Sequence, residues 1–426
     1  MKLWEKGHSI DKKIEQFTIG NDRELDRYLA KYDLQASIAH AYMLQESDLL
    51  TKKENHALIK VLEKLQKQVE SGDFHIEKSF EDVHSKIEYE LVQSLGATGK
   101  KIHTGRSRND QVLVAMLLFF KDHLGHLQEQ LITLIELLLQ LSEKHEKAFL
   151  PGYTHLQVAM PSSFGLWFAA YAELLIDDLY MIQAALKVVD QNPLGSAAGY
   201  GSSFPIDRMS TTKYLGFSAL KVNVVAAQLS REKTAKNIHM ALSSVAHTIG
   251  KFAMDVCLYM NPHFNFIGLP DSLTTGSSIM PHKKNPDLFE VMRGECNKIQ
   301  AAMYETNLIS TNLPSGYHRD YQLLKEKSIL NLLSMENVID ILTYTLPRIE
   351  VKSIDQTDPV YQYVTSVDAI NNLVIQGKSF RDAYQLIANE IKEGTYDSKE
   401  TKAHTHIGSK DNLGIAMIRK KLREVL

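Results

Sequence analysis

The segment at 275–287 carries residue types that could stabilise negative charge during a reaction. Ser277 and Ser278 supply two hydroxyl groups, while Lys283 and Asn285 supply a cation and an amide donor. Fixed donors and cations aimed at a developing negative charge are a common source of large rate gains in enzymes. Taken alone, the segment has a simpler interpretation, which is a solvated turn closed by Asn-Pro before a helix.

Two further polar segments favour a reaction site. Residues 103–111 read His-Thr-Gly-Arg-Ser-Arg-Asn-Asp-Gln and bring donors of several kinds together. Residues 151–157 read Pro-Gly-Tyr-Thr-His-Leu-Gln and place His155 in a loop, where a histidine alone would be read as structural. Binding and catalytic residues concentrate in breaks between long elements. The three segments together therefore favour one reaction site over three unrelated turns.

Helices must position these segments, because helical periodicity dominates the chain. Leucines repeat at alternating steps of three and four from 124 to 141, which is the spacing of helices packed at a shallow angle. Strand signals are few and short. The pattern predicts an all-α fold built on a long-helix bundle, with further long helices at 164–189, 225–260, 287–312 and 323–345.

Three domains are expected along the chain. Helical patterns at 1–107 are shorter and more charged, which predicts a small N-terminal helical domain. The central long-helix bundle is expected at 108–352 and includes the polar loop 275–287, and a small C-terminal domain is expected at 353–426. Long helices with apolar residues on several sides often complete their core by assembling with copies of the same chain.

Composition argues against several classes of function. The 426 residues carry a formal net charge of -3, whereas a protein held to nucleic acid or a membrane surface by charge should be basic. The longest uncharged stretch, 148–172, contains two prolines and does not read as a membrane span. Cys257 and Cys296 lie in apolar or helical stretches, which argues against a disulfide scaffold. We expect a cytoplasmic protein without nucleic-acid or membrane partners.

The polar segments resemble those of a known enzyme superfamily. The pattern Gly-Ser-Ser-x-Met-Pro-x-Lys-x-Asn-Pro at 276–286 resembles the signature of the fumarase/aspartase superfamily. Segments 103–111 and 151–157 are similar to the versions found in the argininosuccinate lyase family. Residues 193–195 and 317–325 also match, so the resemblance covers most of the chain and is weakest at its C-terminal end.

The resemblance implies β-elimination of argininosuccinate to arginine and fumarate, in arginine biosynthesis. In the family pattern Ser277 is the base, and Lys283 and Asn285 stabilise the aci-carboxylate that forms when the proton is removed. His155 and Glu290 match the acid-side pair, in which the carboxylate orients the histidine. The resemblance further implies a homotetramer with active sites shared between subunits, and no metal or organic cofactor.

Substrate contacts follow from the same resemblance. In the family, the positions of Ser107, Arg108 and Asn109 contact carboxylate and amino-acid groups of the substrate. Thr154 matches a donor to the fumaryl carboxylate. Tyr317, Gln322 and Lys325 match positions that hold the arginine end of the substrate. Taken alone, Lys325 would be read as a surface lysine. Residues 81–84, Glu-Asp-Val-His, also match a family segment, although helix capping explains them equally well.

Several positions depart from the family pattern. Ala115 stands where an Asp is usual, and 229–232 reads Leu-Ser-Arg-Glu in place of a Ser-Asp-Arg-Asp run. Asp22 stands where the family has a binding serine, and His282 replaces a commoner glutamine. These departures concern the details of the substrate pocket more than the type of reaction.

Other classes of function remain open at this point. An adenylosuccinate- or aspartate-type lyase would share the bundle, but adenylosuccinate demands extra cationic contacts for its phosphate. A structural bundle protein, like the lens crystallins that share this fold, could lose the reactive residues, and all of them are present here. His404 and His406 could begin a metal site, but no third ligand lies nearby. The small-residue segment 195–204 does not follow a strand, so we interpret it as a turn and not as a phosphate loop.

Overall fold

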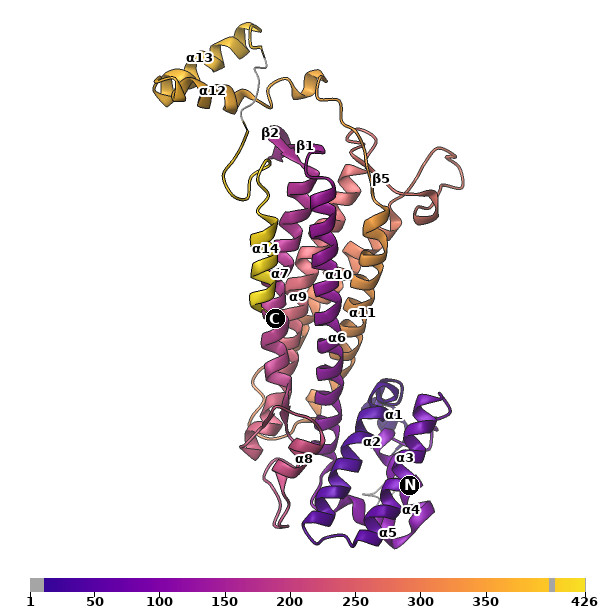
Figure 1. Ribbon diagram of the computed structural model, residues 1–426. Coiled ribbons are helices and arrows are strands. Elements are labelled where there is room, and N and C mark those ends of the chain that lie inside the picture. Colours follow the sequence, from indigo (N-terminus) through magenta and orange to yellow (C-terminus); the bar gives the residue numbers. More distant parts are fainter. Residues whose placement is uncertain (1–10, 398–402, 426) are drawn as a thin grey trace. The chain divides into compact units, whose positions relative to one another are not determined.

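Helices dominate the computed structural model, which describes residues 11–397 and 403–425 (Figure 1). The chain forms two compact units. Unit 1 comprises Met1–Gln128, Met181–Ser244 and Lys298–Glu336, and unit 2 comprises Glu129–Tyr180, Val245–Asn297 and Asn337–Leu426. The division into three domains, with boundaries after residues 107 and 352, stays a prediction.

The longest helices confirm the predicted all-α fold, and each contributes residues to both units. They are α6 (Arg108–Lys144), α7 (Phe164–Val189), α9 (Val224–Tyr259), α10 (Asp287–Ile309) and α11 (Leu323–Thr345). The leucines that repeat between residues 124 and 141 are buried, which explains why their spacing predicted α6. Within the described ranges, no helix is both long enough and apolar enough to cross a membrane.

Shorter helices complete unit 1. They are α1 (Lys12–Ile19), α2 (Asp22–Glu46), α3 (Lys52–Glu70), α4 (Val83–Leu95), α5 (Ala97–Lys100) and α8 (Arg208–Tyr214). A capping box starts α3: the Glu54 N–H donates to Thr51 Oγ1 at 3.2 Å, and the Thr51 N–H donates to Glu54 Oε2 at 2.9 Å. A short parallel pair, β3 (Gln191–Asn192) and β4 (Ala219–Leu220), also lies in this unit.

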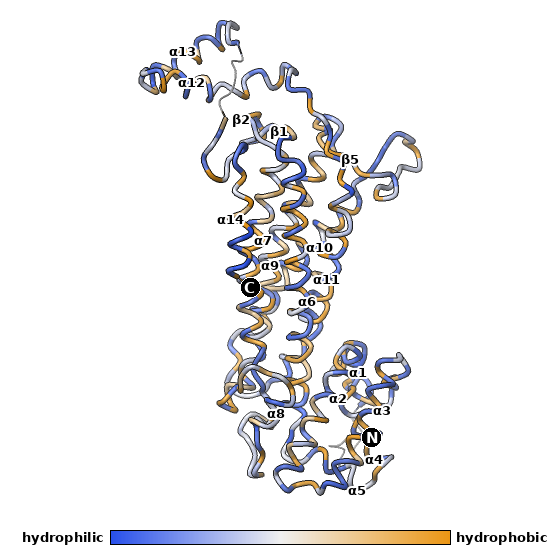
Figure 2. The backbone as a smooth tube through the Cα atoms, in the orientation of Figure 1, coloured by the Kyte–Doolittle hydropathy of each residue, from blue (hydrophilic) through white to orange (hydrophobic). Residues whose placement is uncertain are grey.

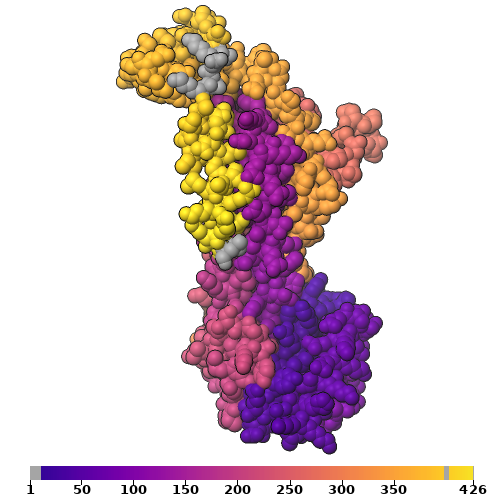
Figure 3. Space-filling model, in the orientation of Figure 1, coloured from indigo at the N-terminus to yellow at the C-terminus, as the bar shows by residue number. Residues whose placement is uncertain are grey.

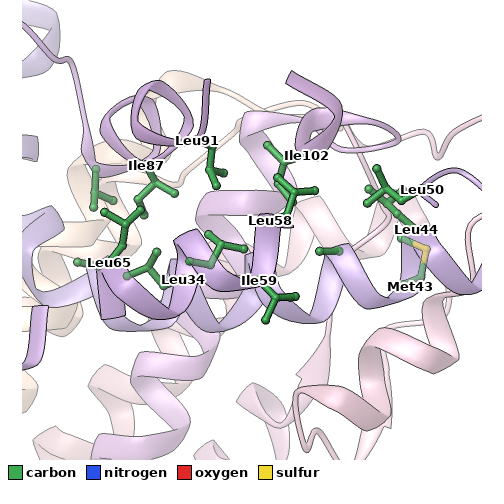
Figure 4. Packing of buried hydrophobic residues seen from close by; sticks show 14 residues of the cluster. Leu34, Met43, Leu44, Leu50, Leu58, Ile59, Leu65, Ile87, Leu91 and Ile102 are labelled. Carbon is green, nitrogen blue, oxygen red and sulfur yellow. The ribbon is translucent and has the colours of Figure 1, made fainter. Parts of the chain in front are cut away.

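An apolar core holds α2, α3 and α4 together (Figure 4). Leu58 and Leu65 of α3 are spaced by seven residues, so they share one face of the helix. Leu34 of α2 and Ile87 of α4 pack into the same cluster and are almost fully buried. Burying a side chain of this size stabilises a fold by about 1.5–3 kcal/mol, so this core fixes the helices that present the acidic residues described below.

Unit 2 contains a hairpin and the C-terminal helices. The antiparallel strands are β1 (Phe149–Thr154) with β2 (Gln157–Ser163), and β5 (Ile267–Gly268) with β6 (Glu350–Val351). A small apolar cluster joins α12 (Ser366–Ile375) to α13 (Phe380–Glu393).

The last helix of unit 2, α14 (Ile415–Val425), is amphipathic: Ile418 and Leu422 are buried, and its charged residues form a hydrophilic stretch (Figure 2). It lies along α6 (Figure 3), where Arg419 Nη1 is 2.5 Å from Glu143 Oε1. It also contacts α7, where Lys421 Nζ is 2.8 Å from Asp177 Oδ1. Buried apolar side chains of α14 and these ion pairs together attach the C-terminal end of the chain to the long helices of this unit.

Candidate active site

A small, solvent-open cavity of about 90 Å³ in unit 1 gathers several of the residues that the sequence singled out. Its walls come from α2, α4, α6 and α9 and from residues 317–325. Both acidic and basic groups line it: Asp22, Asp26, Glu81, Asp82, His84, Arg108, Arg231, Arg319 and Lys325. A cavity lined by both signs of charge suits a ligand that carries both.

Lys325 is buried in this cavity, although in isolation its sequence context suggested a surface lysine. Its Nζ lies 2.7 Å from Asp22 Oδ1 and 2.8 Å from Asp26 Oδ1. Burial alone would lower the pKa of Lys325, but the carboxylates of Asp26 and Asp22 outweigh burial and the pKa is raised. Lys325 is therefore a fixed cation. Asp26 was missed by the sequence analysis, although its spacing of four from Asp22 places both on one helix face.

Gln322 and Tyr317 line the same cavity as Lys325. The Gln322 side-chain amide donates to the carbonyl oxygens of Thr18 at 2.8 Å and Ile19 at 3.3 Å. Tyr317 is half-exposed and receives the guanidinium of Arg231 over its ring, at 5.1 Å from the ring centroid. In this conformation Tyr317 faces the cavity, whereas the amide group of Gln322 is engaged with the end of α1.

Arg231 is a cavity residue that the sequence analysis noted only as part of a departure from the family pattern. Its Nη2 donates to the carbonyl oxygen of Asn109, and its Nε donates to Gln228 Oε1 at 3.2 Å. Burial lowers its pKa to about 10, so it remains a cation at neutral pH. Arg231 thus connects Asn109 with Tyr317, two residues for which the sequence predicted substrate contacts.

The segment 103–111 is held in place by a buried carboxylate. Asp110 accepts hydrogen bonds from the backbone N–H groups of Gly195 at 3.0 Å and Ala197 at 2.9 Å. It also accepts one from the N–H of Ser107 at 2.9 Å. The small-residue segment around 195 therefore anchors the start of α6, which agrees with its interpretation as a turn. Ser107 and Asn109 are half-buried beside this anchor.

Residues 81–84 combine the two roles that the sequence left open. Asp82 caps α4 by accepting from the Ser85 N–H at 2.7 Å, and it also pairs with Arg108 Nη1 at 3.1 Å. His84 lies in the cavity wall, with Nδ1 at 3.2 Å from Asp33 Oδ2. Helix capping and cavity formation are therefore properties of the same segment.

A buried histidine of α2 makes the free energy of unfolding dependent on pH. His40 is fully buried, and its Nε2 lies 2.9 Å from the carbonyl oxygen of Thr104. Burial and the nearby charge of Arg106 lower its pKa to about 3, against about 6.5 in an unfolded chain. As the pH falls from about 6.5 towards 3, only the unfolded chain binds this proton, so folding is destabilised. We expect the free energy of unfolding to fall by up to about 1.4 kcal/mol per pH unit from this group.

Urea unfolding at several pH values between 7 and 4 measures this effect, with His40→Gln as the comparison. The variant should show a shallower pH dependence because it lacks the contribution of His40. Some dependence should persist, because His103 and His239, whose pKa values are also lowered, remain. Equal slopes for the two proteins would show that His40 is not the group responsible.

In unit 2, the turn between β1 and β2 presents Thr154 and His155. The turn residues His155 and Leu156 have φ values of 55° and 58°, a left-handed conformation that is uncommon outside glycine. Two such residues in a row are typical of a tight turn between antiparallel strands. His155 is consequently exposed at the tip of a hairpin, where strain of this kind often accompanies function.

The polar loop 275–287 is closed at its base. Thr275 and Asn285 form an antiparallel bridge, in which the Asn285 N–H donates to the Thr275 carbonyl at 2.8 Å. The side chain of Asn285 donates to the Gly276 carbonyl at 3.3 Å, and Lys284 forms an ion pair with Asp271. These contacts hold both ends of the loop together while Lys283 stays exposed.

Ser277 has a specific environment within this loop. Its Oγ accepts hydrogen bonds from the backbone N–H groups of Ile279 at 3.3 Å and Met280 at 3.1 Å. Donors that face a hydroxyl oxygen favour its ionised form, so this geometry suits a serine that must act as a base. Glu290 lies one turn into α10 and is exposed. Among the described residues, no hydrogen bond or ion pair joins His155 to Glu290 or to Ser277.

The predicted site residues therefore fall into two groups. Unit 1 carries six of them: Ser107, Arg108, Asn109, Tyr317, Gln322 and Lys325. Unit 2 carries the other six: Thr154, His155, Ser277, Lys283, Asn285 and Glu290. The described residues contain no cluster of three or more His, Cys, Asp or Glu side chains arranged to hold a metal. His404 instead pairs with Asp368 at 2.9 Å.

Comparison with known proteins identifies the family to which the chain belongs. A family model described as "Lyase" matches residues 7–301. A protein of Bacteroides thetaiotaomicron named argininosuccinate lyase is 48% identical over 412 residues, which cover 97% of this chain and 92% of that protein. The chain belongs to the argininosuccinate lyase family. A family member from Thermotoga neapolitana is 40% identical over 389 residues, covering 91% of this chain and 98% of that protein.

Solved structures agree with the fold of the family. An EDDS lyase in complex with formate matches with a TM-score of 0.74 at 20% identity, covering 98% of this chain and 90% of that one. A class II fumarase from Schistosoma mansoni matches with a TM-score of 0.75 at 16% identity, covering 89% of this chain and 88% of that one. These structures confirm the predicted fold, while the family model and the curated relatives confirm the recognised lyase family.

Proposed function

We propose that the protein cleaves argininosuccinate to L-arginine and fumarate and acts in arginine biosynthesis. The observation that carries this proposal is the 48% identity, over nearly the whole chain, with a relative named argininosuccinate lyase. The charged cavity of unit 1 and the serine loop of unit 2 supply the two kinds of chemistry that this reaction requires.

Proton removal is the step assigned to the loop. Ser277 takes the proton from the carbon next to a carboxylate of the succinyl group, and the N–H groups of Ile279 and Met280 stabilise its oxygen. The extra negative charge on the substrate carboxylate is stabilised by Lys283 and Asn285. A carbon–carbon double bond then forms as the carbon–nitrogen bond breaks, which releases fumarate and the guanidinium group of arginine. His155, oriented by Glu290, acts on the acid side of the reaction.

The arginine end of the substrate is assigned to unit 1. Tyr317 and Lys325 line the cavity there, and Gln322 joins them if its amide leaves the end of α1. Ser107, Arg108 and Asn109 supply contacts to the succinyl carboxylates, with Thr154 of unit 2 as a further donor. The reaction needs no metal or organic cofactor, because fixed side-chain and backbone donors meet its electrostatic demands.

A homotetramer with shared active sites completes this proposal. Support comes from large apolar side chains exposed on the long helices, including Leu174, Val291, Tyr304 and Leu308. Exposed apolar surface on long helices is typical of bundles that pack against copies of themselves. We place the enzyme in the cytoplasm, without nucleic-acid or membrane partners.

A substrate comparison tests the proposed function. Purified protein is offered argininosuccinate, adenylosuccinate or aspartate separately, and fumarate is followed by its ultraviolet absorbance. We expect fumarate only from argininosuccinate. Arg108, Arg319 and Lys325 in the cavity wall are each paired with a carboxylate, so the described lining leaves no cluster of unpaired cations for a phosphate. Faster release from adenylosuccinate than from argininosuccinate would assign the chain a different substrate.

A further inference from the structure

The hairpin that presents His155 depends on contacts from outside its two strands. A two-stranded hairpin is marginally stable on its own in water. Here the pairing of β1 with β2 shifts register between Gly152 and Tyr153, just before the turn. His155 and Leu156 then follow with positive φ values, and a strained conformation of this kind persists only where surrounding contacts hold it. The position of the His155 side chain therefore depends on what holds the end of β1.

Two phenylalanines of unit 2 hold one side of Tyr153. This residue lies two positions before His155, and its ring meets that of Phe264 nearly at right angles, with centroids 5.5 Å apart. The buried Phe266 lies 6.4 Å from the same ring. Both phenylalanines belong to the segment that joins α9 to β5. Aromatic pairs of this geometry add stability beyond the area that they bury, so Tyr153 is anchored to the body of unit 2.

Tyr361 holds the same strand from the C-terminal part of the chain. It ends a short 3-10 helix, η5 (Pro359–Tyr361), and its side chain is buried. Its ring packs edge to face on Phe149, the first residue of β1, with centroids 6.0 Å apart. Its hydroxyl group lies near that of Tyr153, and burial, followed by the Tyr361 side chain, raises the pKa of Tyr153 to about 12. Tyr361 therefore meets β1 near both of its ends.

Local contacts fix the position of Tyr361 itself. The side chain of Asp358 caps η5 by accepting from the Val360 N–H at 2.9 Å. The Tyr361 N–H donates to the Asp358 carbonyl oxygen, also at 2.9 Å. Pro359 occupies the first turn, where its ring fixes φ. Tyr361 is thus held by its own turn and can act as a rigid support for β1.

We propose that Tyr361 is a positioning residue for the lyase reaction: it holds β1 and so fixes His155 in the place where this histidine acts. The role rests on the proposed function. Because the side chain of Tyr361 is packed against Phe149 and Tyr153, it acts only through the hairpin and not on the substrate. Misplacing a reacting group by about 1 Å can lower a rate about 100-fold, so loss of this support should be visible in turnover.

Steady-state kinetics of the full-length enzyme with argininosuccinate test this inference. Tyr361→Ala removes the ring, and we expect kcat to fall about 10- to 100-fold while KM changes by less than about threefold. The change is confined to kcat because the substrate contacts assigned to unit 1 are untouched. Tyr361→Phe keeps the ring and its contact with Phe149, so it should retain at least about a third of the wild-type kcat. Thermal unfolding shows whether each variant is folded, and Tyr361→Leu, which keeps an apolar side chain, should show the same loss if Tyr361→Ala does not fold.

Tyr363→Ala is the matched control, because Tyr363 lies two residues further along the same segment. Its side chain is exposed, and its ring packs on Tyr396, with centroids 5.9 Å apart. The variant should keep kcat within about twofold of the wild-type value. A loss equal to that of Tyr361→Ala would overturn the assignment, because a general disturbance of this segment would then explain the rate.

A double-mutant cycle shows whether Tyr361 acts through His155. In a His155→Asn enzyme no imidazole remains to be misplaced, so adding Tyr361→Ala should lower the residual turnover by less than about threefold. This residual rate is measured at high enzyme concentration. An equal loss in both backgrounds would overturn the assignment, since the effect of Tyr361 would then be independent of His155.

The proposed function fails separately, through a wild-type protein that releases no fumarate from argininosuccinate. A wild-type enzyme that cleaves argininosuccinate, together with a folded Tyr361→Ala enzyme whose kcat lies within about threefold of it, would reject only the role of Tyr361. Activity of the wild-type protein thus separates the two failures.

Discussion

Ser277→Ala should lower kcat by about 1,000-fold or more while leaving KM nearly unchanged, because it removes the proton acceptor and no packing contact. Ser277 lies in a polar loop, and its Oγ accepts only local N–H groups from Ile279 and Met280. Folding should therefore be unaffected. Steady-state kinetics with argininosuccinate measure the effect, and Ser278→Ala is the matched control because it removes a neighbouring exposed hydroxyl.

A rival assignment makes His155 the base and Ser277 only a hydrogen-bond donor. Under that assignment Ser277→Ala would cost about 10- to 100-fold, and His155→Asn would be the more damaging change. Measuring both variants together separates the two. A Ser277→Ala enzyme that keeps more than about a tenth of wild-type turnover would reject Ser277 as the base.

Lys283→Met should lower kcat by about 100- to 1,000-fold, because it removes a cation assigned to the developing aci-carboxylate. The adjacent lysine offers a close control. Lys284 already forms an ion pair with Asp271 at the exposed base of the loop, so Lys284→Met should change kcat by less than about threefold. Equal losses in the two variants would mean that overall charge of the loop, and not the position of Lys283, governs the rate.

The long helices could be predicted from the sequence because their burial is periodic. The helix predicted at 164–189 matches α7, and that at 323–345 matches α11, since both carry continuous apolar faces. The hairpin that presents His155 could not be predicted as a hairpin. Its turn residues, His155 and Leu156, adopt positive φ values without the Asn-Gly or Gly residues that usually signal such a turn.

Charged groups in the cavity were harder to predict for a different reason. The burial of Lys325 depends on Asp22 and Asp26, which lie about 300 residues earlier in the chain. Arg231 likewise gains its role from Asn109 and Tyr317, which are distant in sequence. Local patterns describe the helices that carry such residues, but the pairing of charges follows from tertiary packing. The family resemblance identified Lys325, whereas Asp26 and Arg231 required the structure.

Quantifying both products of argininosuccinate cleavage tests the central claim most directly. Purified wild-type protein is incubated with argininosuccinate, without added metal or cofactor, and fumarate and L-arginine are measured together by chromatography. The account predicts that the two products appear in equal amounts, and that Ser277→Ala forms neither at more than about a thousandth of the wild-type rate. Absence of both products from the wild-type reaction at every pH from about 6 to 9 would contradict it.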